Sequence, residues 1–179
     1  MIRPIALLAA ASPLVLAPAP LPAARTVETQ TPPSLCHAGE EVIFACRIGA
    51  KRVSVCGGQA GGQRYAQYRF GAPGKLELVH PADGTAGAGD LRFAHIAYSG
   101  GGEGQVSFAN RDVRYVAYSR MTRTRFDGKG NDPAFDSGVV VLRGDKPVAS
   151  MHCSPRDDGN VDWQLAEKYL PEGEPVDLP

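Results

Sequence analysis

Hydrophobic and polar residues alternate in short runs along most of the chain. Between Glu41 and Ile48 every second position is hydrophobic, and in a β-strand such positions share one face. Similar runs occur at 52–56, 64–70, 75–80, 91–99, 105–109, 113–119, 138–143 and 147–153. Turn-forming residues such as Gly, Asp and Asn separate the runs, so we expect successive runs to pair as hairpins.

The pattern predicts an all-β fold with about eight short antiparallel strands. Such a meander closes into a small barrel or folds into a sandwich of two packed sheets, and the sequence leaves both open. Only the stretch 161–170 has helical spacing, and Trp163, Ala166 and Leu170 are able to share one face of that helix. We expect this one short C-terminal helix to end before Pro171 and to pack against one end of the β domain.

The first 24 residues have the organisation of a secretory signal peptide. Arg3 provides a positive start, residues 5–16 are apolar, and small residues follow near Ala23. The apolar stretch is shorter than the roughly 20 residues of a membrane-spanning helix, so no stable membrane anchor is expected. The predicted organisation is a signal peptide (1–24), a flexible segment (25–35), a single β-rich domain (36–170) and a frayed tail (171–179).

Positive and negative charges are balanced in this sequence. The 19 Lys and Arg residues equal the 19 Asp and Glu residues in number. Nucleic-acid-binding domains normally carry a basic patch, so no nucleic-acid partner is expected. No Asn-x-Ser/Thr acceptor for N-glycosylation occurs. Together with the leader, these features favour a bacterial periplasmic protein, with secretion into the medium as the alternative.

The four cysteines form an even set in a chain that we expect to be exported. They are Cys36, Cys46, Cys56 and Cys153. Such a set usually forms disulfides, and four cysteines allow three pairings, which the sequence leaves open. No Cys-x-x-Cys pair occurs, so neither a zinc site nor a thioredoxin-like redox site is expected. No metal and no other cofactor is predicted.

A glycine-rich stretch between Ser99 and Gly104 is the most unusual local pattern. A phosphate-binding loop needs a helix directly behind its glycines, whereas a strand-like run follows here. The stretch is therefore either a permissive turn or a flexible loop that presents Ser99, Gly100 or Glu103 to a partner. We predict binding roles for these three residues.

Three arginines, Arg120, Arg123 and Arg125, lie within six residues of one another. They indicate either an anion-binding role or a solvated loop, and the segment 120–137 is expected to be a long mobile loop. Arg123 and Arg125 join the predicted binding residues. The segment 127–132 is partly acidic, but a lysine within it and the missing closing glutamate distinguish it from a calcium-binding EF-hand loop.

No known catalytic motif is present in the sequence. A nucleophile elbow, a His-Glu-x-x-His pair and a Ser-x-x-Lys pair are all missing. His80 and His95 lie in strand-like runs, where a histidine is more often packed than catalytic. The sequence therefore predicts a binding protein rather than an enzyme.

Part of the sequence pattern resembles known exported proteins. The resemblance is carried by FACRI at 44–48, VSVC at 53–56, YRFG at 68–71 and KLELVHP at 75–81. The chain resembles an uncharacterised family of exported bacterial cysteine-containing β proteins, which brings no established activity. Its architecture is similar to that of the periplasmic inhibitors of c-type lysozyme, which are disulfide-containing eight-stranded β-barrels that present a serine- and glycine-bearing loop to the enzyme. This similarity implies that Ser99, Gly100 and the strand 113–119, which includes Tyr115, are the corresponding features.

These observations lead to one functional expectation. We expect an exported, periplasmic binding or inhibitor module for a protein or cell-wall-related partner, such as a wall hydrolase. The alternatives are an envelope hydrolase with an unrecognised site and a structural envelope protein.

Overall fold

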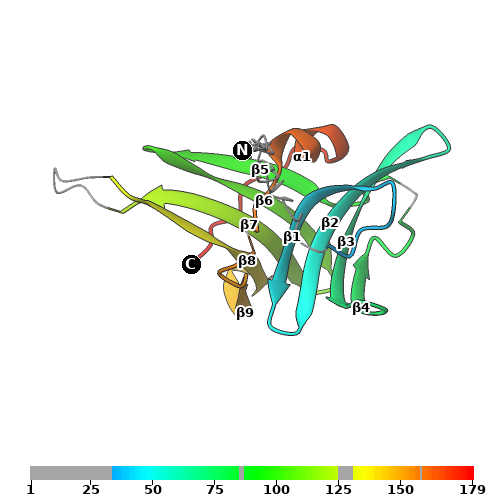
Figure 1. Ribbon diagram of the computed structural model, residues 1–179, viewed down its shortest axis with the longest axis horizontal. Coiled ribbons are helices and arrows are strands. Elements are labelled where there is room, and N and C mark those ends of the chain that lie inside the picture. Colours follow the sequence, from blue (N-terminus) through cyan, green and yellow to red (C-terminus); the bar gives the residue numbers. More distant parts are fainter. Residues whose placement is uncertain (1–33, 85–86, 125–130, 158) are drawn as a thin grey trace, which may run out of the picture.

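The computed structural model describes residues 34–84, 87–124, 131–157 and 159–179. Within them, the chain forms two antiparallel sheets and one helix (Figure 1). Sheet A contains β1 (Glu41–Ile48), β2 (Lys51–Ala60), β3 (Gln63–Ala72) and β4 (Lys75–His80). Sheet B contains β5 (Arg92–Tyr98), β6 (Gly101–Asn110), β7 (Val113–Arg123), β8 (Pro133–Arg143) and β9 (Lys146–His152). Each strand pairs with its neighbour in the chain, so both sheets are meanders. The predicted signal peptide lies outside the described residues.

The predicted all-β fold is confirmed, and of its two forms the chain adopts the sandwich. The two sheets are separate and are not closed into a barrel. A barrel, as in the lysozyme inhibitors, needs a hydrogen-bonded ladder at every strand boundary. In the described residues no such ladder joins β1 to β9, although Ser154 N donates to Arg47 O (2.8 Å) beyond the end of β9. The core between the sheets includes Phe44, Val53, Val55, Tyr68, Phe93, Val106, Phe108, Ala117 and Val139.

Both faces of sheet A are buried in the middle of β1, β2 and β3. In β2, Val53 and Val55 belong to the core, while Ser54 between them points to the opposite face and is equally buried. Residues 34–40 cover that outer face, where Leu35 N donates to Ser54 Oγ (2.9 Å). A strand that is covered on both sides buries consecutive residues, which explains why burial in β2 does not alternate.

The C-terminal segment covers the outer face of sheet B. Phe93 N donates to Pro171 O (2.9 Å) and Gly173 N donates to Phe93 O (2.8 Å), so the segment first runs beside β5. Val176 then packs with Val116, Tyr118, Val140 and Leu142 of β7 and β8. The prediction of a frayed tail is therefore wrong, because these residues shield an apolar face that water would otherwise contact.

The predicted C-terminal helix is confirmed as α1 (Trp163–Tyr169). The side chain of Asp162 caps its N-terminus. Ala166 and Leu170 pack into the core, and α1 contacts β1, β2 and β3, while Trp163 lies over sheet B. In the described part of the chain, no helix has the length and apolar character needed to cross a membrane.

Two segments predicted as loops are largely strands. The turn after β5 consists of Ser99 and Gly100, and the glycines from 101 onward belong to β6, which pairs with β5 and β7. Most described residues of the predicted loop 120–137 are also strand, because residues 120–123 of β7 and 133–137 of β8 belong to one ladder that ends at the pair Arg123 and Pro133. Pairing with β5 and β7 holds the glycines of β6 extended, and pairing between β7 and β8 does the same for residues 120–123 and 133–137, without hydrophobic alternation. Residues 125–130, which cover most of the acidic segment, lie outside the described residues.

The cysteines form two disulfides, Cys36–Cys56 and Cys46–Cys153, with Cα–Cα distances of 5.4 and 5.5 Å. The prediction of two disulfides is confirmed, and the structure defines the pairing. The first attaches the N-terminal segment to β2, and the second joins β1 of sheet A to the residue after β9. Disulfides persist in oxidising compartments, so the protein belongs to an extracellular or periplasmic environment.

Candidate functional site

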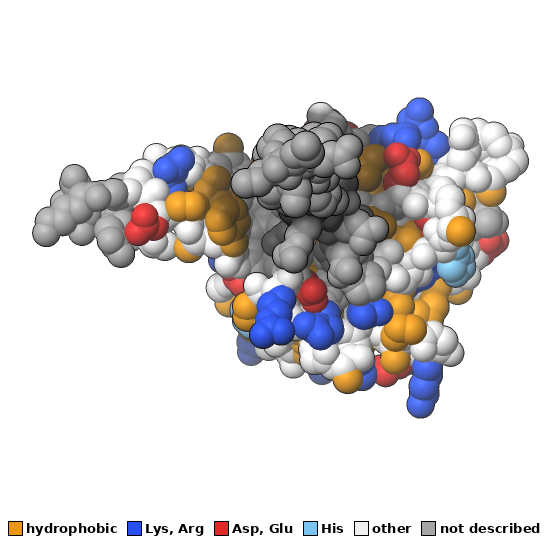
Figure 2. All heavy atoms as spheres, in the orientation of Figure 1, with side chains coloured by type: hydrophobic (Ala, Val, Ile, Leu, Met, Phe, Trp, Pro, Cys, Tyr) orange, Lys and Arg blue, Asp and Glu red, His pale blue; other side chains and the backbone are white. Residues whose placement is uncertain are grey.

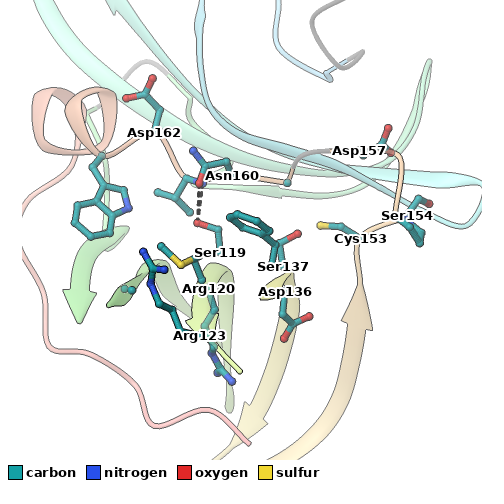
Figure 3. Close-up of a pocket in the computed structure, with 18 of the residues that line it drawn as sticks. Ser119, Arg120, Arg123, Asp136, Ser137, Cys153, Ser154, Asp157, Asn160 and Asp162 are labelled. Carbon is teal, nitrogen blue, oxygen red and sulfur yellow. Dashed lines mark hydrogen bonds between the residues drawn. The ribbon is translucent and has the colours of Figure 1, made fainter. Parts of the chain in front are cut away.

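Sheet B extends past the edge of sheet A and carries an open hollow (Figures 1 and 3). The hollow has a volume of about 1360 Å³. Its floor is formed by the ends of β6, β7 and β8, and its wall by residues 153–157 and 159–162, which we call the wall loop, and by the start of α1. The floor residues include Gly101, Gly102, Ser119, Met121, Phe135 and Ser137. Because they lie on paired strands, the floor is held in place by the sheet.

Trp163 borders the hollow, and two glycines of β6 make room for its indole. A Cβ at Gly104 would lie 2.6 Å from Nε1 of the ring, and a Cβ at Gly102 would lie 3.3 Å from Cη2. Glycine is needed at position 104 because the indole approaches the backbone closely, whereas at position 102 a side chain would require a small shift of the ring. The indole also contacts His95 and Phe93, with ring centroids 5.4 and 6.4 Å away. Trp163 is thus anchored but remains 39% exposed.

The wall loop is attached to the floor by hydrogen bonds and close packing. Val161 N donates to Ser119 Oγ (2.9 Å), and that hydroxyl donates to Asn160 Oδ1 (3.3 Å; Figure 3). Gly159 is buried against the floor, since a Cβ there would lie 2.5 Å from Ser137 Oγ. The wall and the floor therefore form one packed unit.

Two arginines line the hollow, and both bind other parts of the chain. Arg120 Nε donates to Glu103 Oε2 (2.7 Å). Burial alone would lower the pKa of Arg120, but this contact with Glu103 raises it above its ordinary value. Arg123 donates to the backbone oxygens of Gly100 (2.9 Å) and Asn131 (3.2 Å). Arg123 thus braces the β5–β6 turn against the residues that precede β8.

Three aspartates complete the charged lining, and each accepts a hydrogen bond within the protein. Asp136 accepts from Tyr118 Oη (2.9 Å), Asp157 accepts from Arg47 N (3.0 Å), and Asp162 caps α1. Burial, together with the hydrogen bond to Asp136, raises the pKa of Tyr118, so its hydroxyl stays protonated and remains a donor. Each charged group of the lining therefore makes at least one internal contact, although Asp136 is still 44% exposed.

Phe135 stands at the rim of the hollow and is 78% exposed. Figure 2 shows hydrophobic side chains on the projecting part of sheet B, at the left of the molecule. A single exposed hydrophobic residue is common on protein surfaces. Here, however, Phe135 and the partly exposed Trp163 border the same hollow, which makes it the candidate site.

The structure brings two predicted binding residues together at the edge of the hollow. Gly100 and Arg123 both line it and are hydrogen-bonded to each other. Ser99 lies next to Gly100 in the exposed turn. Arg125 lies outside the described residues.

Glu103 and Tyr115, also predicted to bind a partner, have other surroundings. Glu103 was expected in a flexible loop, but it lies in β6 and is 1% exposed. It accepts hydrogen bonds from Tyr98 Oη (2.6 Å), Gln105 Nε2 (2.7 Å) and Arg120. A carboxylate buried among three donors forms a structural network rather than a mobile contact. Tyr115 packs against the core between the sheets.

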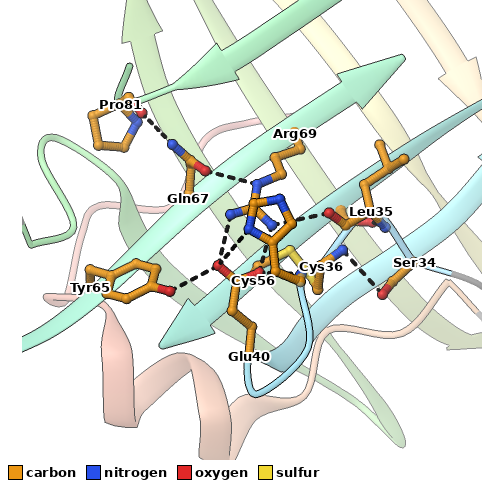
Figure 4. Close-up of polar contacts among 11 residues, drawn as sticks. Ser34, Leu35, Cys36, Glu40, Cys56, Tyr65, Gln67, Arg69 and Pro81 are labelled. Carbon is orange, nitrogen blue, oxygen red and sulfur yellow. Dashed lines mark hydrogen bonds and ion pairs between the residues drawn. A yellow bond between two sulfur atoms is a disulfide. The ribbon is translucent and has the colours of Figure 1, made fainter. Parts of the chain in front are cut away.

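A second buried ion-pair network lies on the outer face of sheet A (Figure 4). Glu40 and Arg69 form two hydrogen bonds, of 2.5 and 2.7 Å, and each side chain is 3% exposed. Gln67 Oε1 accepts from Arg69 Nε (2.8 Å), and Tyr65 Oη donates to Glu40 (2.9 Å). Burial alone would raise the pKa of Glu40, but hydrogen bonds from Arg69, the His37 backbone and Tyr65 hold it below its ordinary value.

The same region groups three atoms of types that bind metals. The Sγ atoms of Cys36 and Cys56 and a carboxylate oxygen of Glu40 lie within 4.8 Å of one another. The two sulfur atoms are bonded in a disulfide and provide no thiolate, while the carboxylate is paired with Arg69. These atoms therefore serve as a covalent link and an ion pair.

Two histidines pair with aspartates. His80 Nε2 lies 2.5 Å from Asp90 Oδ1, and its ring stacks on Phe108 with centroids 4.3 Å apart. His152 Nδ1 lies 3.1 Å from Asp136 Oδ1. Among the described residues neither ring is hydrogen-bonded to a serine or threonine hydroxyl, which is the contact that activates such a nucleophile in a hydrolase.

Two prominent residues of the hollow, Trp163 and Phe135, are not among the predicted binding residues. Trp163 was interpreted only as part of the helix, and Phe135 fell within the predicted loop. The sequence does carry one signal, because Gly102 and Gly104 occupy alternate positions and share a strand face. Paired glycines of this kind indicate a bulky neighbour, but they do not identify it.

No family model matches the chain, and neither a curated protein nor a solved structure matches it. The resemblance to exported bacterial β proteins therefore stays a prediction.

Proposed function

We propose that the protein is an exported binding module that holds a protein or cell-wall-related partner in the hollow of sheet B. In a narrower version of this proposal, the protein inhibits a wall-degrading enzyme such as a c-type lysozyme. Export follows from the signal peptide predicted at residues 1–24. The two disulfides support a compartment outside the cytoplasm, where such a partner is present.

The observation that carries this proposal is the pair of exposed aromatic residues at a preformed hollow. Phe135 and Trp163 are 78% and 39% exposed and border the same space. Aromatic side chains are frequent anchors in interfaces because they bury a large area with few rotatable bonds. Phe135 is on β8 and the indole is seated on β6, so binding requires little ordering of the chain.

The polar groups of the hollow also favour binding over catalysis. Asp136, Asp157 and Asp162 accept hydrogen bonds from the protein, and Arg120 is paired with Glu103. A catalytic acid or base has to reach the substrate in a defined protonation state. The internal contacts hold these side chains in place, which favours a preformed binding surface.

The test uses the protein exported by a bacterial host and purified with both disulfides formed. Binding to purified cell-wall sacculi is measured by cosedimentation, and binding to c-type lysozyme by calorimetry together with a lysis assay. We expect saturable binding to at least one of them, and Phe135→Ala should weaken it at least tenfold. Val148→Ala is the matched control, because Val148 is 50% exposed on β9 and does not line the hollow.

Each result has a defined consequence. Failure to bind both sacculi and lysozyme at micromolar protein contradicts the proposal. Binding that Phe135→Ala and Val148→Ala reduce equally places the partner outside the hollow. Binding without inhibition of lysis contradicts the inhibitor role and agrees with a binding module that does not inhibit.

A further inference from the structure

We infer that the ligand of the hollow is a neutral oligosaccharide, such as a stretch of N-acetylated wall glycan. This inference rests on the proposed function and specifies the chemical class of its partner. It follows from the charge, the aromatic surface, the free hydrogen-bonding groups and the size of the hollow.

The charges of the hollow disfavour an anionic ligand. Its three aspartates accept hydrogen bonds from the protein, Arg120 is paired with Glu103, and Arg123 is bound to backbone oxygens at the edge. An anionic ligand would be repelled by the three carboxylates and would have to draw Arg120 away from Glu103, which is costly because that carboxylate is buried. A neutral ligand leaves all of them intact.

The aromatic surface fits a sugar ring. A pyranose has an apolar face of C–H groups and a rim of hydroxyls, and aromatic rings provide a flat apolar surface for that face. Trp163 is held against Gly102 and Gly104 and presents its exposed part to the hollow, and Phe135 is on β8 at the rim. Two aromatic contacts at separate positions suit a chain of several rings rather than one.

Neutral polar side chains in the hollow are available to bind the hydroxyl groups at the rim of a sugar ring. The side chains of Ser137, Ser154 and Gln164 line the hollow, and none of them has a hydrogen-bond partner among the described residues. Asn160 uses its Oδ1 for Ser119, and its amide nitrogen remains available to donate. Hydroxyls and amides both donate and accept, which matches the hydroxyl and acetamido groups of a glycan.

The size of the hollow agrees with this ligand class. Its volume of about 1360 Å³ exceeds the roughly 300–1,000 Å³ of pockets that enclose a drug-sized molecule. An open space of this volume accommodates several sugar rings of an extended chain.

The single tryptophan of the sequence gives the experiment a specific readout. The exported, disulfide-bonded protein is titrated with the hexamer of N-acetylglucosamine, and the emission of Trp163 is followed, with calorimetry in parallel. We expect a saturable change in emission and a dissociation constant below 1 mM, on the scale of weak specific binding. Gln164→Ala should weaken binding at least threefold, whereas Gln59→Ala, at an exposed position of β2 outside the lining, should leave it unchanged. Trp163→Phe should weaken binding in calorimetry.

The outcomes separate this inference from the proposed function. If lysozyme binds through Phe135 and the hexamer does not bind, the saccharide inference fails and the binding module stands. If a sulfated oligosaccharide of equal length binds more tightly than the neutral hexamer, the neutral class is wrong. If hexamer, sacculi and lysozyme all fail to bind, both proposals fail.

Discussion

Cys46 and Cys153 are bonded to each other across 107 residues of sequence, and their disulfide joins β1 of sheet A to the residue that follows β9 of sheet B. The other disulfide, Cys36–Cys56, spans 20 residues and attaches the N-terminal segment to its own sheet. The Cys46–Cys153 disulfide therefore links the two sheets, and the Cys36–Cys56 disulfide links the N-terminal segment to the sheet that it covers.

The long bridge should contribute more to stability than the short one. Loop-closure entropy predicts a loss of about 5 kcal/mol for Cys46→Ala with Cys153→Ala, and about 3 kcal/mol for Cys36→Ala with Cys56→Ala. Each pair has one deeply buried cysteine, Cys46 at 2% and Cys56 at 0% exposure, so the packing losses are comparable. Urea unfolding of the two double variants measures the difference. A larger loss for the short bridge would contradict the prediction.

Gly104→Ala should displace the indole of Trp163. The new Cβ would lie 2.6 Å from Nε1, and overpacking of this kind typically costs about 1–3 kcal/mol. Gly102→Ala should have a smaller effect, because its Cβ would lie 3.3 Å from the ring. The free energy of unfolding and the emission maximum of the single tryptophan measure both variants. Equal effects would show that contact with the indole is not the reason for glycine at position 104.

Because of Glu40, the free energy of unfolding should decrease as the pH is lowered into the acidic range. Its pKa lies below the ordinary 4.5 in the folded protein, because hydrogen bonds from Arg69, His37 N and Tyr65 outweigh the effect of burial. The stabilisation is therefore fully present above pH 4.5 and is lost as the pH falls through the lower folded-state value. Unfolding between pH 7 and pH 3 should show a shallower decline for Glu40→Gln than for the unchanged protein.

A control for the Glu40 prediction is Glu77→Gln. Glu77 pairs with Lys51 at the surface, where both side chains are more than 40% exposed. Such pairs contribute little to stability. If Glu77→Gln flattens the acid decline as much as Glu40→Gln does, the effect is not specific to the buried pair.

The C-terminal segment should be part of the folding unit. Gln105 and Val176 exchange two hydrogen bonds, of 2.8 and 2.7 Å, and the side chain of Val176 packs on the outer face of sheet B. Val176→Asp should lower the free energy of unfolding by about 2–4 kcal/mol, because a charge would replace a buried apolar group. Glu174→Ala, at an exposed position of the same segment, should change it by less than about 0.5 kcal/mol. Similar losses for both variants would contradict this role of Val176.

Most strands were predictable because one face of each strand packs in the core, while the other face contacts water or a single covering segment of the chain. The runs at 41–48 and 75–80 match β1 and β4 in their limits, since alternation and turn residues act locally. The hollow was only partly predictable. Gly100 and Arg123 were identified as candidates, but their hydrogen bond joins residues 23 positions apart, which no local pattern reveals.

The sequence by itself determined the all-β class, the antiparallel meander, the single short helix and the formation of two disulfides. These follow from hydrophobic alternation, turn residues and an even number of cysteines. Only the tertiary structure decided which cysteines pair, why Gly102 and Gly104 are glycines, and that Glu103 is a buried ion-pair partner. The physical reason is that each of these depends on a group brought close by the packing of distant segments: β9 near β1, the indole on β6, and the C-terminal segment over sheet B.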